Sequence, residues 1–132
     1  MWEKLDIITN NHVEFKDVTG EVQQVVTRSR LPTGMCYLYV PHTTAAVLIN
    51  ENADPDVMAD IAAGLERAVP FAAGYRHVEG NSAAHIKSVL VGQNATLFIE
   101  NSRLVLGTWQ GIFFAEFDGP RRRQLYVKIT GD

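Results

Sequence analysis

The segment from residue 109 to residue 117, WQGIFFAEF, constrains the fold more than any other part of the chain, because it is apolar on both faces of a strand. Successive side chains of a strand point to opposite sides of the sheet. Trp109, Phe113 and Phe117 then lie on one face, and Ile112 and Phe114 lie on the other. Such a strand has to be covered on both sides, either by other layers of its own chain or by a neighbouring subunit.

Alternating apolar patterns predict further short strands. The clearest is CYLYV, residues 36–40, followed after a bend at Pro41 by an almost continuous apolar run at 45–49. Proline cannot donate a ladder hydrogen bond, which places Pro41 at a bend or an edge. The remaining strands are expected at residues 3–9, 12–16, 95–100, 103–106 and 122–129. Short turns at 10–11 and 118–120 join several of them, which is typical of antiparallel pairing.

Helical periodicity predicts two to three helices among these strands. One begins near Asp17 or Thr19 and stops before Pro32; a second begins at 54–56; a third begins at Asn81 or Ser82 and ends at Gly92. Polar caps, a proline in the first turn and a glycine at the end are ordinary helix boundaries. The apolar residues expected to face the core are Val22, Val25 and Val26, then Val57, Ile61, Leu65 and Val69, and finally Ile86, Val89 and Leu90.

The element order and the bulk composition together define a broad class. Strands outnumber helices, so we expect one α+β domain over residues 1–132 with mainly antiparallel sheets. The net charge of −3 argues against nucleic-acid binding, and any anion site has to be local. Cys36 is the single cysteine, so no intramolecular disulfide forms. The chain has no signal-peptide run and no apolar stretch of about 18 residues, which favours a cytoplasmic protein without membrane contact.

Histidines are the first candidates for chemistry. His42 follows Pro41 at the strand bend, His77 lies in a predicted loop, and His85 lies one turn into the third helix. Three imidazoles entering one pocket would suit zinc or a similar divalent ion. The spacing matches no zinc-finger or HExxH pattern, and a single histidine is more often a surface or hydrogen-bonded core residue. That simpler interpretation is kept for His12.

Two acidic residues follow the apolar run at 45–49. Glu51 comes at the end of the predicted strand, where a carboxylate could act as a general acid or base or support a metal. Asp54 could share that role, although its position as a helix N-cap explains it equally well. For Glu51 the catalytic and the structural interpretations stay open.

Several residues could hold a phosphate group. The unpaired amides at a helix start are a ready anion seat, which places Gly80, Asn81 and Ser82 among the candidates. Hydroxyls of Thr43 and Thr44 and one guanidinium among residues 121–123 could add donors. The full set of predicted substrate-binding residues is Thr43, Thr44, Gly80, Asn81, Ser82, Trp109, Gln110 and Arg121. Every capped helix has such amides, so a plain cap remains the alternative.

Three long blocks in a fixed order carry a family resemblance. They are VPHTTAAVLINENADPDV at 40–57, YRHVEGNSAAHIKSVLVG at 75–92 and LGTWQGIFFAEFDGPRRR at 106–123. With these blocks the chain resembles the YjbQ-like proteins, a family also labelled secondary thiamine-phosphate synthases. The resemblance implies a sandwich-like α+β domain, a homotrimer, and a bound divalent metal, commonly zinc, at His42, His77 and His85. It also implies an activity that joins a pyrimidine diphosphate to a thiazole phosphate.

The residue types leave several functions open. Three-histidine sites usually hold zinc that activates water, whereas diphosphates usually recruit magnesium through carboxylates. This difference suggests that synthase activity is a side reaction. A metal-assisted hydrolase or a transferase that acts on another small phosphorylated substrate fits these residue types equally well. The alternatives are a non-catalytic trimeric module that binds a metal or a metabolite, and a purely structural role for the histidines.

Overall fold

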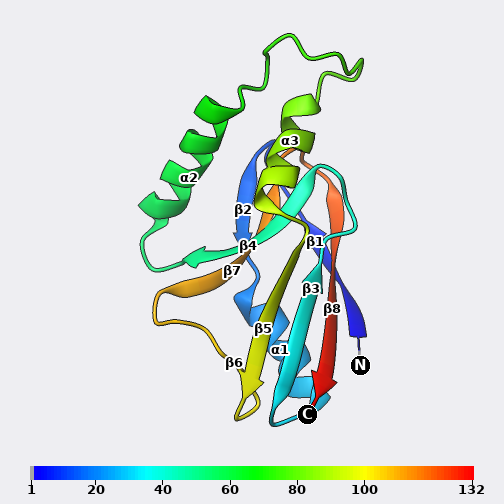
Figure 1. Ribbon diagram of the computed structural model, residues 1–132, viewed down its shortest axis with the longest axis vertical. Helices are drawn as coiled ribbons and strands as arrows, with labels where there is room; N and C mark the ends of the chain where they lie inside the picture. Colours follow the sequence, from blue (N-terminus) through cyan, green and yellow to red (C-terminus); the bar gives the residue numbers. More distant parts are fainter. Residues whose placement is uncertain (1) are drawn as a thin grey trace.

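The computed structural model describes residues 2–132 as eight strands and three helices in one α+β domain (Figure 1). The strands are β1 (Trp2–Ile8), β2 (Glu14–Asp17), β3 (Gly34–Tyr39), β4 (Ala45–Glu51), β5 (Asn94–Glu100), β6 (Arg103–Leu104), β7 (Gln110–Glu116) and β8 (Arg122–Gly131). The helices are α1 (Thr19–Ser29), α2 (Pro55–Ala68) and α3 (Ser82–Val91). Each predicted strand and helix is present, with ends displaced by a few residues at most.

The strands form two antiparallel sheets. A five-stranded sheet has the order β1-β8-β3-β5-β6, and a three-stranded sheet has the order β2-β7-β4. Each pairing between neighbours is antiparallel, as predicted. The bend at Pro41 ends β3 in the first sheet and lets the chain enter the second sheet as β4.

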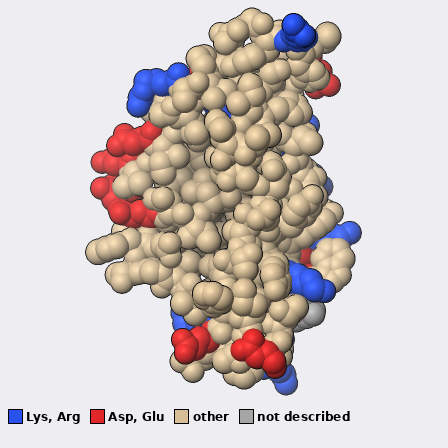
Figure 2. All heavy atoms as spheres, viewed as in Figure 1, with Lys and Arg blue, Asp and Glu red and all other residues tan. Residues whose placement is uncertain are grey.

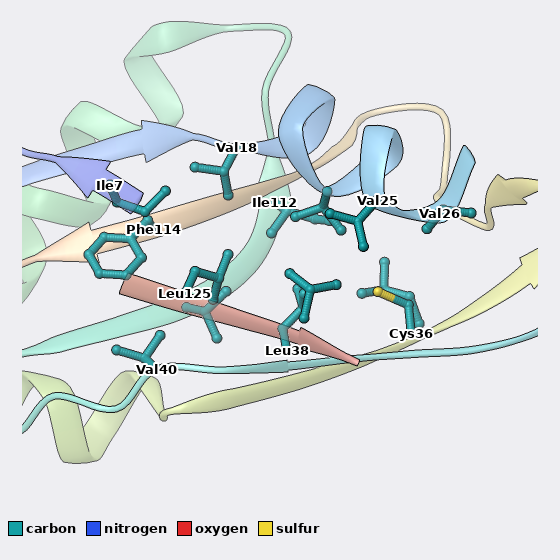
Figure 3. Packing of buried hydrophobic residues seen from close by; sticks show 14 of the residues in the cluster. Ile7, Val18, Val25, Val26, Cys36, Leu38, Val40, Ile112, Phe114 and Leu125 are labelled. Carbon is teal, nitrogen blue, oxygen red and sulfur yellow. The ribbon is translucent and has the colours of Figure 1, made fainter. Parts of the chain in front are cut away.

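The main core lies between the five-stranded sheet and a layer formed by α1 and the three-stranded sheet. Figure 3 shows Leu38 and Leu125 from the larger sheet facing Val25 of α1 and Phe114 of β7. These side chains are almost completely excluded from solvent. The face of α1 predicted to be buried, with Val22, Val25 and Val26, is confirmed.

The strand that is apolar on both faces is covered by its own chain. Ile112 and Phe114 of β7 belong to the main core. On the opposite face, Ala115 and the adjoining Phe117 pack in a second cluster with Ala84 of α3, and Leu65 of α2 lies against that cluster. The apolar character of this segment therefore follows from its place as the middle strand of a sheet with a layer on each side.

The predicted orientation of α3 is wrong. Ile86, Val89 and Leu90 were expected in the core, but their exposed fractions are 37%, 75% and 62%. The buried side of the helix carries two alanines with Lys87 and Ser88. Small alanine side chains allow close approach to β4, and the buried polar groups are satisfied: Lys87 Nζ lies 3.3 Å from Glu66 Oε1, and Ser88 Oγ donates to the carbonyl oxygen of Ala84 at 2.8 Å.

The second helix is only loosely covered. Asp54 accepts a hydrogen bond from the Asp56 amide at 2.9 Å and caps the helix, with Pro55 in its first turn, as predicted. Of the expected apolar face, Val69 at the C-cap is buried, whereas Val57, Ile61 and Leu65 are half-buried; Met58 is buried in addition. Figure 1 shows α2 at the side of the molecule, joined over the top to α3. Among residues 2–132, no helix combines the length and apolar character that a membrane crossing requires.

Gly34 gives a direct test of the sheet packing. A Cβ atom at this position would lie 2.0 Å from the carbonyl oxygen of Thr130 on β8. We therefore expect Gly34→Ala to lower the free energy of unfolding by at least about 1–3 kcal/mol. In the matched control Gly20→Ala, on α1, the new methyl group meets no atom within 4 Å, and stability should rise by about 0.5–1 kcal/mol. Urea denaturation of both variants measures the difference, and equal stabilities would contradict the described register.

Candidate functional site

The connection from β3 to β4 and the helix α3 bring predicted site residues to one end of the molecule. His42, Thr43 and His85 line a single pocket of about 520 Å³. The other lining residues are Gln93 and four apolar or aromatic residues, Tyr39, Val40, Pro41 and Val89. A volume of this size lies within the range of about 300–1,000 Å³ that is usual for small-molecule sites.

His42 is held firmly in one orientation. Its Nε2 atom accepts a hydrogen bond from the backbone N–H of Gln124 at 2.9 Å. Burial lowers the pKa of His42, and the positive charges of Arg123 and Arg121 act in the same direction, while Glu116 opposes them. A neutral imidazole that accepts at Nε2 carries its proton on Nδ1. His42 therefore presents a donor, and not a free lone pair, to its surroundings.

The rings of His77 and His85 contact each other beside this pocket. Their ring centroids are 5.5 Å apart, and the ring planes are nearly perpendicular, at 89°. His77 also borders a smaller hollow of about 260 Å³, lined by Gly80 and by residues 71–75. His85 thus links the pocket that contains His42 with the loop that contains His77.

Of the three predicted metal ligands, His77 and His85 lie next to each other and His42 lies apart from His77. Two imidazoles on one tetrahedral zinc ion have ring centroids about 5 Å apart, given zinc–nitrogen bonds of about 2.0–2.1 Å; the centroids of His77 and His85 are 5.5 Å apart. His42 does not fit as it stands, because the Gln124 amide uses its Nε2 lone pair. Within the described part of the chain, no three or more His, Cys, Asp or Glu side chains are grouped closely enough to hold an ion.

A buried ion pair lies beneath His42. Arg123 Nε donates to Glu116 Oε1 at 2.8 Å, and Arg123 Nη2 donates to Glu116 Oε2 and to Thr44 Oγ1. The Thr9 hydroxyl and the Asp118 amide also donate to the Glu116 carboxylate. Burial raises the pKa of Glu116, but these hydrogen bonds outweigh burial and hold the pKa below its ordinary value.

The ion pair accounts for two residues that the sequence left ambiguous. Thr44 was a candidate for substrate binding, but it is buried and its hydroxyl accepts a hydrogen bond from Arg123. Of the arginines at 121–123, Arg123 is buried on the same face of β8 as Leu125 and Val127 and pairs with Glu116. The sequence signal for Glu116, missed as a site residue, is a carboxylate inside the most apolar strand of the chain, where a buried charge requires a partner.

Asn81, Asp118 and Arg121 form a second polar cluster at the start of α3. Asn81 Nδ2 donates to Asp118 Oδ2 at 2.9 Å, and Arg121 Nη2 donates to the same oxygen at 2.9 Å. The Asn81 side chain does not cap α3, and Asn81 Oδ1 is buried with no hydrogen-bond partner in residues 2–132. Gly80 adopts a φ of 78°, a left-handed conformation that favours glycine. The first amides of α3, at Ser82 and Ala83, therefore lack a side-chain cap.

Four predicted site residues lie elsewhere. Glu51 and Asp54 line a separate pocket of about 340 Å³ with Asp17 and Phe113. Both carboxylates accept local backbone hydrogen bonds: Glu51 accepts from the Asp54 amide, and Asp54 accepts from the Asp56 amide. Because β4 runs from Ala45 to Glu51, its ends are about 20 Å apart at 3.3 Å per residue. The structure therefore does not bring Glu51 and Asp54 to the histidines of the same chain.

Trp109 and Gln110 lie at the same far end as Glu51. Gln110 pairs with Glu51 across the sheet, and its side chain accepts a hydrogen bond from the Gly107 amide at 2.8 Å. Trp109 is 63% exposed. His12 packs on Phe71 with ring centroids 4.8 Å apart and has its Nε2 atom 3.8 Å from Asp118 Oδ1, outside the histidine pocket.

Comparison with known proteins shows the family of this chain. The family model described as "UPF0047 protein YjbQ-like" matches residues 3–132. The chain belongs to this family. Among UPF0047 proteins, a relative from Methanocaldococcus jannaschii is 52% identical over 129 residues, which cover 98% of this chain and 94% of the relative. YugU of Bacillus subtilis is 46% identical over 132 residues, covering 99% of this chain and all of YugU.

Solved structures of the UPF0047 family share the whole fold. A YjbQ/UPF0047 protein from Clostridium acetobutylicum superposes with a TM-score of 0.95 at 49% identity, covering 97% of this chain and 99% of that one. A protein of Sulfolobus solfataricus, described as YbjQ-like and of unknown function, gives a TM-score of 0.96 at 31% identity, covering 100% and 97%. The YjbQ-like resemblance read from the three sequence blocks is confirmed.

Proposed function

We propose that this UPF0047 protein is an enzyme that acts on a small phosphorylated metabolite bound in the pocket of His42, Thr43 and His85. The convergence of these three residues on one pocket is the observation that carries the proposal. The charge of Arg123 is paired with Glu116 and that of Arg121 with Asp118, so the pocket would hold an anion through hydrogen-bond donors such as the His42 imidazole. In this account His42 donates a hydrogen bond to the substrate through Nδ1.

The start of α3 supplies a seat for a phosphate group. The amide of Ser82, a half-buried residue, has no side-chain cap, and Gly80 provides the backbone turn that leads into the helix. Such amides bind anions because they are unpaired and lie at the positive end of the helix dipole. Arg121 adds a half-exposed guanidinium to this seat.

A divalent metal, with zinc as the first candidate, belongs to the same proposal. His77 and His85 would hold it, because their rings already have the separation of two ligands on one ion. His42 would join them only after release of the Gln124 amide. A bound ion of this kind would supply positive charge to a phosphate oxygen.

The named form of the activity is thiamine-phosphate synthesis, in which a pyrimidine diphosphate and a thiazole phosphate are joined with loss of pyrophosphate. The helix amides and Arg121 suit a pyrophosphate leaving group. Carboxylates that would recruit magnesium lie at the far end of β4, with Glu51 and Asp54. This separation favours synthesis as a side reaction of a transferase or a metal-assisted hydrolase.

The position of Glu51 and Asp54 supports a second candidate function, a non-catalytic module that binds a metal or a phosphorylated metabolite. Glu51 and Asp54 were the predicted acid and base, and neither lines the histidine pocket. A binding module would keep the anion seat and the histidines but would not turn over any substrate.

Turnover assays of the wild-type protein and two variants distinguish these candidates. The wild type should release pyrophosphate from a pyrimidine diphosphate in the presence of a thiazole phosphate, or inorganic phosphate from one of a panel of phosphomonoesters. His85→Ala should reduce the rate at least about 100-fold, whereas the control Arg103→Ala, at an exposed position on β6, should leave it unchanged. Equal rates in the wild type and His85→Ala would contradict the enzyme proposal. Pyrophosphate binding without turnover would favour the binding module.

We also propose that the chain assembles as a homotrimer through the exposed face of α3. Ile86, Val89 and Leu90 form an apolar stripe in contact with the pocket, since Val89 is one of its walls. Exposed apolar stripes of this kind usually mark an interface. A partner chain on this face would cover the rim of the pocket and exclude water from it.

The assembly proposal predicts a change in mass. Leu90→Lys should convert a particle of three chains into single chains, because it places a charge in the apolar interface without altering the protomer core. Val105→Lys, at a half-exposed position between β6 and β7, is the matched control and should keep the larger mass. Light scattering during gel filtration measures both, and an unchanged mass for Leu90→Lys would contradict the proposed face.

A further inference from the structure

Gln93 lies between α3 and β5 and lines the histidine pocket. Its side chain is held in one orientation, because Nε2 donates to the carbonyl oxygen of Ser88 at 3.1 Å. Its backbone is held as well, since its carbonyl oxygen accepts a hydrogen bond from the Val40 amide at 2.7 Å. Gln93 is therefore a fixed part of the pocket wall.

The Oε1 atom of this side chain is free to bind a ligand. Among residues 2–132, no donor forms a hydrogen bond with Gln93 Oε1, whereas Nε2 is paired. The end of α3 does not depend on Gln93, because the Ser88 carbonyl oxygen also accepts from the Gly92 amide at 2.8 Å. An amide that is fixed through its donor presents its carbonyl oxygen as an acceptor for an N–H or O–H group.

The polar groups of the pocket lie toward two ends. His42 follows Val40, which binds Gln93, by two residues, a step of at most about 7 Å. His85 precedes Gln93 by eight residues, and most of this length is helix α3. The distance from the two histidines to Gln93 is therefore on the order of 10 Å. A substrate with its phosphate beside the histidines extends along α3 and meets Gln93 with its other end.

The group that meets Gln93 is a neutral donor. Among the described residues, no Asp or Glu lines this pocket, and an ammonium group taken out of water needs a carboxylate partner. On the face shown in Figure 2, most acidic side chains lie over α2 and at the lower end of the molecule, whereas the surface over α3 is largely uncharged. The apolar walls at Val40, Pro41 and Val89 suit a flat ring. An amino group on an aromatic nitrogen heterocycle is such a donor, because it carries no charge at neutral pH.

From these observations we infer that Gln93 is a specificity-determining residue of the histidine pocket. Its Oε1 atom accepts a hydrogen bond from the amino group of an aromatic nitrogen heterocycle, and the phosphate of the same molecule lies beside His42 and His85. A nucleotide with an amino-substituted base has these two groups at opposite ends of an extended molecule. This inference rests on the proposed function, since it needs a phosphate in the pocket. It adds the contact by which the site rejects phosphates that lack the amino group.

Isothermal titration calorimetry with matched ligands tests the inference. Cytidine monophosphate and adenosine monophosphate are each compared with the analogue in which hydrogen replaces the amino group, and pyrophosphate reports on the phosphate site alone. For at least one base, the wild type should bind the amino compound about 2- to 12-fold more tightly than its analogue, as expected for one neutral hydrogen bond. Because this preference is measured on the wild type, it does not depend on the folding of any variant.

Two variants then assign the preference to Gln93. Gln93→Met keeps the length of the side chain and removes the acceptor, so both ligands of a pair should bind with equal affinity, and pyrophosphate binding should not change. A residue that only supports the fold would instead weaken both ligands of a pair and keep their ratio. Gln24→Met, at an exposed position on α1, is the matched control and should keep the preference.

The outcomes separate this inference from the proposed function. If the wild type binds pyrophosphate but does not distinguish the ligands of either pair, the role of Gln93 is overturned and the phosphate site stands. A preference that persists in folded Gln93→Met also overturns that role. If the wild type binds neither pyrophosphate nor a nucleotide, the proposed phosphate site fails, and this inference fails with it.

Discussion

Replacing Arg123 with methionine is expected to lower the free energy of unfolding by about 3–5 kcal/mol, because it leaves the Glu116 carboxylate buried without its counter-charge. Glu116 is completely buried and Arg123 is 4% exposed. The loss also removes the hydrogen bonds from Arg123 Nη2 to the carbonyl and hydroxyl oxygens of Thr44. Urea denaturation followed by circular dichroism measures the change.

Two further variants make this prediction specific. Arg122→Met removes the neighbouring arginine, which is exposed on the other face of β8, and should change stability by less than about 0.5 kcal/mol. The double variant Glu116→Leu with Arg123→Met should be more stable than Arg123→Met alone, because no unpaired charge is left inside. An Arg123→Met protein as stable as Arg122→Met would show that the ion pair is not buried as described.

Removal of His77 or His85 is expected to weaken zinc binding at least about 100-fold, more than the effect usual for residues that only support a ligand. The prediction follows from the 5.5 Å separation of these two rings. His42→Ala is the informative comparison. Because Gln124 uses its Nε2 lone pair, this variant should retain most of its zinc affinity while losing substrate binding.

Metal analysis of protein dialysed against limiting zinc measures the three variants directly. His12→Ala serves as the control for the loss of an imidazole outside the pocket. Equal loss of zinc in His42→Ala and His85→Ala would instead favour the three-histidine set that the family resemblance implied. Retention of zinc in all the variants would place the metal elsewhere or make it adventitious.

Much of the fold could be predicted because its determinants are local. The alternation of Cys36, Leu38 and Val40 and the two apolar faces of β7 both follow from the period of a strand, and the structure has each of them in the predicted place. The orientation of α3 could not be predicted this way. Its buried face is made of alanines, a serine and a lysine, and the buried Lys87 has its partner in Glu66, twenty-one residues away.

Only some of the predicted site residues lie together in the structure. His42 and Thr43 at the end of β3 and His85 on α3 do share a pocket. Glu51 is only nine residues from His42, but the intervening strand carries it to the opposite end of the molecule. Glu116 has two side-chain partners, Thr9 just after β1 and Arg123 on β8. No local sequence pattern predicts that these residues meet.

The most direct test of the central claim is a crystal structure of the protein grown with zinc and pyrophosphate. The account predicts zinc on His77 and His85, and pyrophosphate in the adjoining pocket with an oxygen on the Ser82 amide and within reach of Arg121. Pyrophosphate bound beside Glu51 and Asp54, or zinc and pyrophosphate at separate ends of the molecule, would contradict the account.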